Sequence, residues 1–375
     1  MKILVLCYEY PPLGGGGGRV AQTVAEQLAA RGHEVRVQTA GMRHLPAREM
    51  VGGVDVFRTH AFRAREDRCS VPEMGLFCAT SLGPVLRHCR EWQPDVMHAH
   101  FAMPTGVLAW WARRRTGVPY VLTAHLGDVP GGVPEQTDRL FRLVAPVARR
   151  VWKEAAAVTA VSSFVQELAE RAYGRKVQRI LNGIELGDVP APAAAAKTRH
   201  LVFVGRFNPQ KCPLFLIDAL AGVQDLDWKL TMIGDGLLMA ATRRQADFYK
   251  LTPRIDFTGW LKGAEVQSRL AGADVLLMPS NSEGLPVAAI EALKYGLAVV
   301  ASDIPGVRDV VIDGVNGLRI PVGAAEDWIA RLRELLNDDA RLAAMKRASW
   351  EKARDFDLAR IAAQYEQVLV AASRR

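Results

Sequence analysis

Two glutamates eight positions apart, Glu283 and Glu291, stand where a buried strand is predicted to run into a helix. An apolar run over 273–278 predicts the strand, and Pro286 and Gly296 mark the start and the end of the helix. Glu291 then lies about 8 Å along the helix axis from its start. The free amides and positive dipole there favour a phosphate between the carboxylates. For such a pair alone, the favoured interpretation is that the two carboxylates merely complement the helix dipole.

Two cations, Arg206 and Lys211, follow another predicted strand over 200–205 and precede a predicted helix over 213–220. Both side chains therefore start from the carboxyl end of a strand, where open α/β sheets bind their ligands. Arginine binds a phosphate through two hydrogen bonds, and lysine binds it as a point charge. Such a pair can hold a diphosphate and stabilise negative charge on it, although for an arbitrary pair with this spacing an ordinary surface position is the expectation.

His125 ends a further predicted strand over 118–125, again at a carboxyl end. A run of five glycines, 14–18, follows the first strand (2–8), precedes a helix predicted from about Arg19 to Ala30, and leaves backbone amides open to a ligand. The run does not match a dinucleotide fingerprint, because Arg19 stands at the third glycine position, and it does not match a P-loop. A nicotinamide or ATP cofactor is therefore not predicted.

The whole block 279–296, with its E-x7-E spacing, resembles the donor-site signature of retaining GT-B glycosyltransferases of the family four type, also called glycosyl transferases group 1. The segment 205–211 resembles the family's Gly-Arg-hydrophobic-x-x-x-Lys element. The segment 123–128 resembles its Thr-x-His-Gly-x-Asp element, although Leu126 replaces the glycine. The resemblance extends over nearly the whole chain and is strongest over 205–302.

This resemblance implies roles for individual residues. The catalytic set would comprise two cations on the diphosphate, a carboxylate on the sugar hydroxyls and a histidine closing over the sugar: Arg206, Lys211, Glu283 and His125. The donor-binding set would comprise backbone groups over the phosphates, sugar and base, with one carboxylate on the ribose: Gly16, Gly17, Gly284, Leu285, Val287, Glu291, Trp260 and Leu261. The helix start is expected near Leu285.

The implied reaction moves a hexose-type sugar from a UDP- or GDP-sugar to an unidentified acceptor, with retention and without a cofactor or a metal ion. No Asp-x-Asp pair occurs where the diphosphate would lie, since Asp225 and Asp227 precede a strand. Retention is expected because neither a base nor a nucleophile is evident beside the sugar. A nucleotide-sugar epimerase and a catalytically silent sugar-nucleotide-binding protein remain alternatives.

The order of strands and helices predicts an α/β protein, and the resemblance makes it a GT-B fold of two Rossmann-like domains with parallel sheets facing across a cleft. The expected parts are an acceptor-side domain over 1–190, a Pro/Ala-rich linker over 191–199 and a nucleotide-sugar-binding domain over 200–352. A last helix in 353–375 is expected to return to the first domain. In that domain 52–59 is expected to form a strand.

Composition sets the remaining expectations. The chain has 375 residues, 49% hydrophobic and 23% charged, which indicates a globular protein. Five cysteines without a C-x-x-C pair fit a reducing cytoplasm. The net charge of +8 resides mostly in the first half, which suits an anionic acceptor or peripheral contact with the inner membrane face. Of the adjacent Trp110 and Trp111, one is expected in the core and one near the surface. No nucleic-acid partner is expected.

Overall fold

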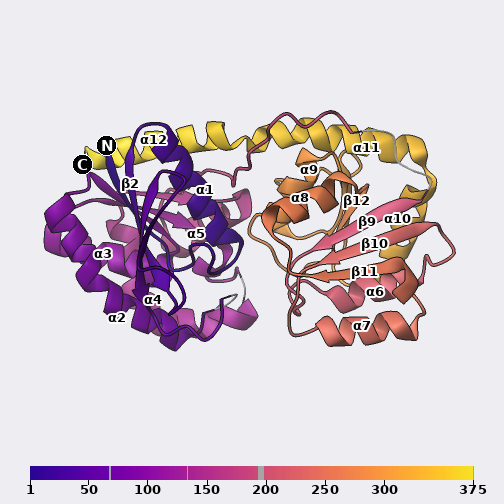
Figure 1. Cartoon of the computed structure of the whole chain (residues 1–375), viewed down its shortest axis with the longest axis horizontal. Helices are drawn as coiled ribbons and strands as arrows, with labels where there is room; N and C mark the ends of the chain where they lie inside the picture. The colour runs from indigo at the N-terminus through magenta and orange to yellow at the C-terminus, as the bar shows by residue number, and fades with distance from the viewer. Residues whose placement is uncertain (67–68, 133, 193–197, 375) are drawn as a thin grey trace. The chain divides into compact units, whose positions relative to one another are not determined.

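The computed structural model describes residues 1–66, 69–132, 134–192 and 198–374 (Figure 1). The chain forms two compact units. Unit 1 comprises Met1–Glu185 together with Leu358–Arg375, and unit 2 comprises Leu186–Asp357. Unit 1 is therefore discontinuous in sequence, because its last segment is made after the whole of unit 2.

Unit 2 begins at Leu186, ahead of the linker expected over 191–199, of which 193–197 lie outside the described residues. A hydrogen bond explains the early start: the indole Nε1 of Trp350 donates to the carbonyl oxygen of Val189 at 3.1 Å. This bond ties the segment before the proline-rich stretch to the end of unit 2.

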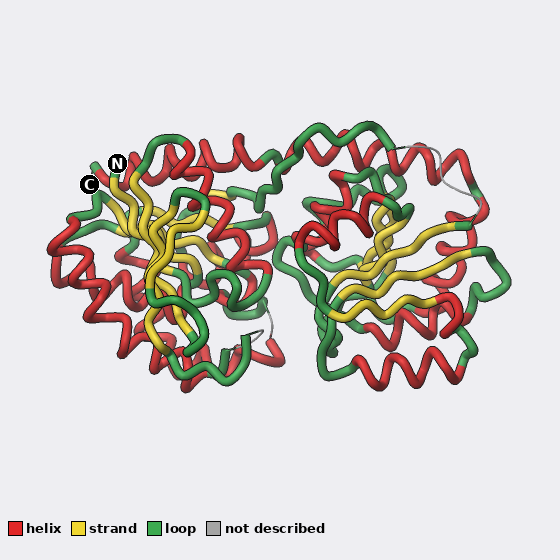
Figure 2. Tube along the Cα trace, in the orientation of Figure 1, coloured by secondary structure: helices red, strands yellow, loops and turns green. Residues whose placement is uncertain are grey.

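Unit 1 is built on an eight-stranded sheet with the order β3-β4-β2-β1-β5-β6-β7-β8 (Figure 2). All neighbouring strands are parallel except β3 and β4. The strands are β1 Lys2–Leu6, β2 Glu34–Gly41, β3 Arg48–Val51, β4 Val54–His60, β5 Val96–His100, β6 Tyr120–Ala124, β7 Ala157–Ala160 and β8 Gln178–Arg179.

The antiparallel pair corrects the single strand expected over 52–59. The chain makes a hairpin there, because Gly52 and Gly53 both have positive φ, 55° and 78°, and form a two-residue turn between β3 and β4. Sequence pattern identified β4 and missed the short, mostly exposed edge strand that precedes it. The sheet is thus parallel with one antiparallel edge.

Among the described residues of unit 1, six segments form α-helices: α1 Gly16–Ala30, α2 Val71–Arg87, α3 Val107–Thr116, α4 Pro134–Glu154, α5 Ser163–Tyr173 and α12 Leu358–Ser373. The last helix, α12, contacts α1, β5 and β6. Its buried face includes Ile361, Tyr365 and Leu369. The final helix of the chain therefore covers the first sheet.

Unit 2 is built on a six-stranded parallel sheet with the order β11-β10-β9-β12-β13-β14. Its strands are β9 Arg199–Val204, β10 Trp228–Ile233, β11 Ile255–Gly259, β12 Val275–Met278, β13 Ala298–Ser302 and β14 Gly317–Ile320. Its helices are α6 Pro213–Ala221, α7 Met239–Phe248, α8 Gly263–Ala271, α9 Val287–Lys294, α10 Ala325–Asn337 and α11 Asp339–Lys352. The core beneath them holds Phe207, Trp228 and Trp328.

Each sheet reverses its strand order once, beside its first strand. In unit 1 the chain moves outward from β1 on one side and resumes at β5 on the other, and in unit 2 it does so at β9 and β12. Open α/β sheets bind ligands outside the carboxyl ends of the strands at such reversals. The topology thus marks the ends of β1 and β5, and of β9 and β12.

Among the described residues, no helix combines the length and apolarity needed to cross a membrane. The adjacent tryptophans of α3 behave as expected from their 100° separation on a helix: Trp110 is 6% exposed and Trp111 is 40% exposed. Trp111 has the guanidinium group of Arg115 over its ring at 5.3 Å.

Candidate functional site

The loops that follow β9 and β12 in unit 2 bring Lys211 and Glu283 together. The Nζ of Lys211 lies 2.5 Å from Oε1 of Glu283, and the side chains are 19% and 10% exposed. Charged groups this buried are stable only when paired. A cation and a carboxylate from two separately predicted site segments are therefore in contact, at the reversal point of the sheet.

Backbone hydrogen bonds hold these two loops against each other. The amide of Asn281 donates to the carbonyl oxygen of Gln210 at 2.8 Å. In return, the side-chain amide of Gln210 donates to the carbonyl oxygen of Ser282 at 2.9 Å. Lys211 itself is fixed at its backbone, because its N–H donates to Oδ1 of Asn208 at 3.0 Å. Arg206 follows Gly205 on the same loop, and its side chain is exposed.

Three glycines that the sequence reading did not select shape these loops. A Cβ on Gly306, just after β13, would overlap the carbonyl oxygen of Glu283. A Cβ on Gly234 would overlap the carbonyl oxygen of Gly205, and one on Gly236 would lie 2.7 Å from that of Phe207. Such close backbone approach needs glycine. The sequence did contain a feature that could have identified them: each glycine lies within a few residues of the carboxyl end of a strand.

Helix α9 begins at Val287, with Pro286 as its N-cap residue, so the expected start near Leu285 was two residues early. Leu285 is buried and Gly284 and Val287 are half-buried, at the turn between Glu283 and the helix. Glu291 is the fifth residue of the helix, roughly 6 Å from its first residue at 1.5 Å per residue. This distance is shorter than the roughly 8 Å expected from the sequence. It still allows a ligand with a diphosphate at the helix start to reach Glu291 with one end.

Trp260 and Leu261 follow β11 directly, at the same end of the sheet as the two loops. The indole of Trp260 is 57% exposed, and Leu261 is half-buried. The sheet order places β11 two strands from β9, beyond β10. A large exposed aromatic side chain at this position belongs to the site end of unit 2, not to its core.

In unit 1, helix α1 begins at Gly16, three residues before the start expected at Arg19. The reason is steric: a Cβ on Gly18 would overlap the carbonyl oxygen of Glu9, and one on Gly17 would lie 2.6 Å from Cζ of Phe101. Only glycine lets the helix start this close to the loop after β1 and to the end of β5. The glycines are part of the helix and not merely a flexible loop before it.

His125 faces this helix start. An added Cβ on Gly17 would lie 3.4 Å from Nδ1 of His125. The ring of Phe101 stacks on that of His125, with centroids 4.4 Å apart and planes at 29°. Phe101 reaches this position through a left-handed backbone, φ 74°, which is strained for a bulky residue. Phe101 is a candidate site residue that the sequence reading missed, since nothing in its type signals that conformation.

Asp128 fixes the backbone around His125. One carboxylate oxygen accepts the amide of His125 at 2.8 Å, and the other accepts the amide of Ala102 at 2.8 Å and that of Met103 at 3.5 Å. The carboxyl group therefore joins the loops after β5 and β6. Burial raises the pKa of Asp128 from 3.8 to about 7, against the lowering effect of these three donors.

Two more histidines lie behind His125. His100 Nδ1 is 3.4 Å from His125 Nε2, and the rings of His100 and His98 have centroids 4.2 Å apart. His98 Nε2 lies 2.7 Å from Oγ1 of Thr123. Burial lowers the pKa of His98 to about 3 and that of His125 to about 4, and lowers the pKa of His100 well below 6.5. All three rings are neutral at pH 7.

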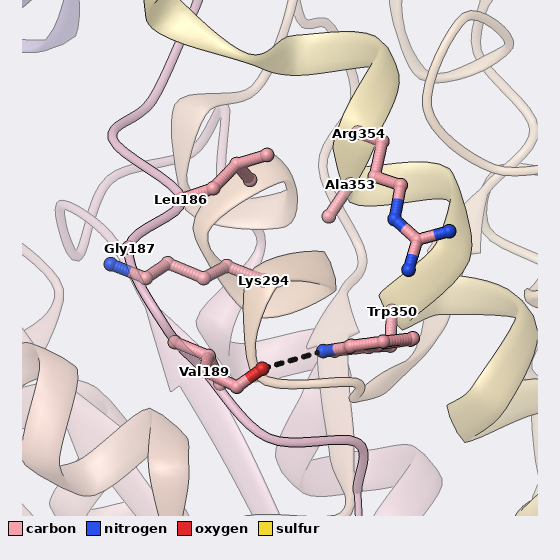
Figure 3. A pocket seen from close by; sticks show the side chains of 7 residues that line it. All are labelled: Leu186, Gly187, Val189, Lys294, Trp350, Ala353 and Arg354. Carbon is pink, nitrogen blue, oxygen red and sulfur yellow. Dashed lines mark hydrogen bonds between the residues drawn. The ribbon is translucent and has the colours of Figure 1, made fainter.

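A small pocket of about 80 Å³ lies in unit 2 at the other end of α9 (Figure 3). Lys294 is the last residue of that helix, whereas the Glu283 loop precedes the first. The pocket is lined by the first residues of unit 2, by Lys294 and by the end of α11 and the turn after it: Leu186, Gly187, Val189, Lys294, Trp350, Ala353 and Arg354. None of the predicted site residues lines it.

The predicted residues thus form two groups, one at the site end of each sheet. Unit 1 holds Gly16, Gly17 and His125, and unit 2 holds the others. The unit 2 group joins a half-buried cation and a buried carboxylate to the start of α9, which suits an anionic ligand with hydroxyl groups. The unit 1 group offers neutral rings and a glycine-lined surface.

Comparison with known proteins gives the same family over both units. A sequence model described as "Glycosyltransferase Family 4" matches residues 14–188, and one described as "Glycosyl transferases group 1" matches residues 189–352. The chain is 30% identical over 415 residues to a D-inositol 3-phosphate glycosyltransferase from Thermobispora bispora, covering 98% of this chain and 92% of that one. It is 29% identical over 404 residues to a glycogen synthase from Mycobacterium tuberculosis, covering 100% and 95%.

Solved structures agree on the fold. A sucrose-phosphate synthase from Thermosynechococcus elongatus superimposes with a TM-score of 0.84 at 22% identity, covering 98% of each chain. HepE from Anabaena, solved with UDP and glucose, superimposes with a TM-score of 0.77 at 21% identity, covering 99% of this chain and 100% of that one. The GT-B fold expected from the sequence is confirmed, and the chain belongs to the family 4 glycosyltransferases (glycosyl transferases group 1).

Proposed function

We propose that this glycosyltransferase moves a hexose-type sugar from a UDP- or GDP-sugar to its acceptor with retention of configuration and without a metal ion. The observation that carries the proposal is the pairing of Lys211 with Glu283 at 2.5 Å, in the turn that leads into α9. A cation for the leaving group and a carboxylate for the sugar hydroxyls are therefore neighbours at the reversal point of the sheet.

The leaving group gathers negative charge as the glycosidic bond breaks. Arg206 and Lys211 start from one loop, and the free amides of α9 start from the other. Preorganised cations and amides of this kind stabilise developing charge more than they stabilise the neutral ground state. On this proposal Lys211 exchanges part of its contact with Glu283 for the diphosphate when the donor binds.

The sugar and the ribose occupy opposite sides of the diphosphate. Glu283 and the amides of Gly284, Leu285 and Val287 bind the sugar hydroxyls, and Glu291, farther along α9, binds the ribose hydroxyls. In unit 1, His125 binds the sugar, and Gly16 and Gly17 bind the donor phosphates. Backbone groups of Trp260 and Leu261 bind the base.

The similarity to HepE supports a uridine donor in particular. Structures of that protein contain UDP, UDP with glucose, or UDP-glucose. HepE superimposes over nearly all of this chain, although at 21% and 20% identity. Incubation with a panel of UDP- and GDP-sugars, followed by nucleotide release, tests both the donor and the turnover.

Unit 1 is the proposed acceptor side. The positive excess in the first half of the sequence suits an anionic acceptor, and Trp111, exposed beside Arg115, suits peripheral contact with an anionic membrane surface. A sedimentation assay with anionic and neutral vesicles tests this part of the proposal. Equal recovery in the supernatant with both vesicle types would contradict the membrane contact.

Metal independence follows from the cations, because two positive side chains and a helix start replace a divalent ion at the diphosphate. Addition of a chelator is expected to leave the rate within a few-fold of its value without chelator. A strict requirement for Mg²⁺ or Mn²⁺ would contradict the proposal. Sites for these ions prefer clustered carboxylates, not lysine and arginine.

Retention is tested through the product. Since this proposal assigns Glu283 to the sugar hydroxyls, front-face substitution, with the leaving phosphate accepting the acceptor's proton, is the proposed route. Proton NMR coupling should show the donor's α-configuration in the product, and a β-linked product would contradict the proposal.

Two other outcomes would indicate the alternative functions. Consumption of the donor without an acceptor, to give an epimer, would indicate an epimerase. Tight binding without turnover would indicate a silent binding protein.

A further inference from the structure

Three buried histidines of unit 1, His98, His100 and His125, lie next to one another, joined by one ring contact and one polar contact. Oγ1 of Thr159 lies 2.8 Å from Oγ1 of Thr123, which lies 2.7 Å from Nε2 of His98. The ring of His98 packs against that of His100, whose Nδ1 lies 3.4 Å from Nε2 of His125. The side chains of His98 and His100 are completely buried.

Each of these rings carries one proton, because burial keeps all three neutral at pH 7. The position of that proton follows from the nitrogens that have no partner. Among the described residues, neither Nε2 of His100 nor Nδ1 of His98 has a hydrogen-bond partner. A buried N–H without an acceptor is the rarest kind of unsatisfied polar group, so both unpartnered nitrogens are best left unprotonated.

This condition settles which ring nitrogens donate. His98 must carry its proton on Nε2 and donate it to Oγ1 of Thr123. His100 must carry its proton on Nδ1 and donate it to Nε2 of His125. His125, which accepts at Nε2, must then carry its own proton on Nδ1.

We propose that His100 is a positioning residue that holds His125 in the tautomer protonated on Nδ1, with that N–H directed toward the start of α1. The contacts of the ring agree with this role, since Phe101 covers its face and Nδ1 is the nitrogen nearest to Gly17. The role in catalysis rests on the proposed function, in which His125 donates to a sugar oxygen. The tautomer itself does not depend on that function.

The tautomer is measured directly by nitrogen NMR of the wild-type protein labelled with ¹⁵N-histidine. A His125→Gln sample identifies the His125 signals. We expect the two ring nitrogens of His125 to show a protonated Nδ1 and an unprotonated Nε2. A protonated Nε2 would overturn the proposal, even if no variant of His100 folded.

Two substitutions at His100 then test its role. His100→Leu removes the donor, and His125 should shift to the other tautomer or to a mixture of both. His100→Asn keeps a side-chain N–H near the position of Nδ1 and should retain the wild-type tautomer. The control is His88→Leu, which removes another buried histidine of unit 1 that packs against Phe57. An unchanged His125 spectrum in His100→Leu would refute the role of His100.

Kinetics separate positioning from mere support of the fold. Because the proton at Nδ1 is needed at the transition state, His100→Leu should lower kcat about tenfold or more while the donor KM changes less than threefold, and His100→Asn should recover most of kcat. Equal loss of kcat in both variants would contradict the positioning role. If the protein lacks transferase activity but His125 is protonated on Nδ1, the proposed function fails and the tautomer assignment stands.

Discussion

In unit 1, β5 and β6 lead into buried, neutral histidines, His100 and His125, whereas in unit 2 β9 and β12 lead into loops joined by an ion pair. The topology of the two ends is the same, and both use glycine where two backbones approach. The chemistry differs in charge: unit 2 presents a cation and a carboxylate, which suits the charged part of the proposed donor, whereas unit 1 presents neutral rings that can donate single hydrogen bonds. Similar folds therefore carry unlike chemistry through the residues at their strand ends.

The largest expected difference between the two units is in their stability at acidic pH, where unit 1 should be destabilised more than unit 2. Burial lowers the pKa of four histidines of unit 1, His88, His98, His100 and His125, below 6.5. The stability that they contribute is complete above pH 6.5 and is lost as the pH falls through their folded-state pKa values, on the order of 2 kcal/mol for each fully buried ring at pH 5. Asp128 opposes this loss, because its raised pKa favours the folded state at low pH.

Hydrogen exchange compared peptide by peptide at pH 7 and pH 5, corrected for the intrinsic exchange rate, measures this difference. Protection should fall in β5 and β6 well before it falls in β9 and β12. His200 is the only histidine of unit 2 in the sequence. Loss of protection in both units at the same pH, or in unit 2 first, would contradict the comparison.

Lys211→Ala should give the largest loss of activity. It removes a charge-assisted contact to the proposed diphosphate, worth about 1.5–3 kcal/mol, which corresponds to roughly a 10- to 100-fold lower kcat/KM. The control is Lys294→Ala, which removes a lysine at the opposite end of α9. Donor kinetics of both variants, with melting curves to show that they fold, provide the measurement. Wild-type kinetics in Lys211→Ala would remove this lysine from the site.

The close backbone approaches can be tested in each unit by a pair of glycine substitutions. Gly18→Ala and Gly306→Ala force a Cβ into the carbonyl oxygens of Glu9 and Glu283 and should each lower the free energy of unfolding by about 1–3 kcal/mol. Gly15→Ala and Gly272→Ala are matched controls, because an added Cβ meets nothing closer than 3.9 Å at either position. Urea unfolding measures all four variants.

Activity should distinguish the same variants. Gly18→Ala moves the helix start beside His125, and Gly306→Ala moves the Glu283 loop, so both should lose turnover in excess of their loss of stability. Equal stability and turnover in the substituted and control variants would show that these contacts relax easily and do not shape the sites.

Trp260→Ala should have the smallest effect. Its indole is 57% exposed, and the proposed contact to the base comes from the backbone. Substitution of an exposed side chain usually changes binding free energy by less than about 0.5 kcal/mol, so the donor KM should change about twofold. A tenfold increase in the donor KM would show that the indole itself stacks on the base, so that unit 2 would bind the donor through an aromatic contact as well as through charge.

In unit 2 the candidate site residues could be chosen from the sequence, because most of them are charged or stand at fixed distances from strand ends. Lys211 and Glu283 were assigned separately, and the spacing could not show that they pair. In unit 1 the sequence indicated His125, but the contact with Phe101 depends on a left-handed backbone that no residue type signals. The hairpin at β3 and the early start of α1 were missed for a related reason, since glycine is permissive and its conformation is decided by what packs against it.

The placement of α12 has a consequence for how the protein is made. Tyr365 of this helix packs against His98, with ring centroids 5.3 Å apart, so a segment synthesised after the whole of unit 2 covers the inner end of the histidine cluster. Unit 2 is continuous and can fold as soon as it emerges, while unit 1, although synthesised first, must wait with part of its sheet uncovered. Translation that stops after unit 2 would therefore release a chain with its second half complete and its first half exposed to chaperones and proteases.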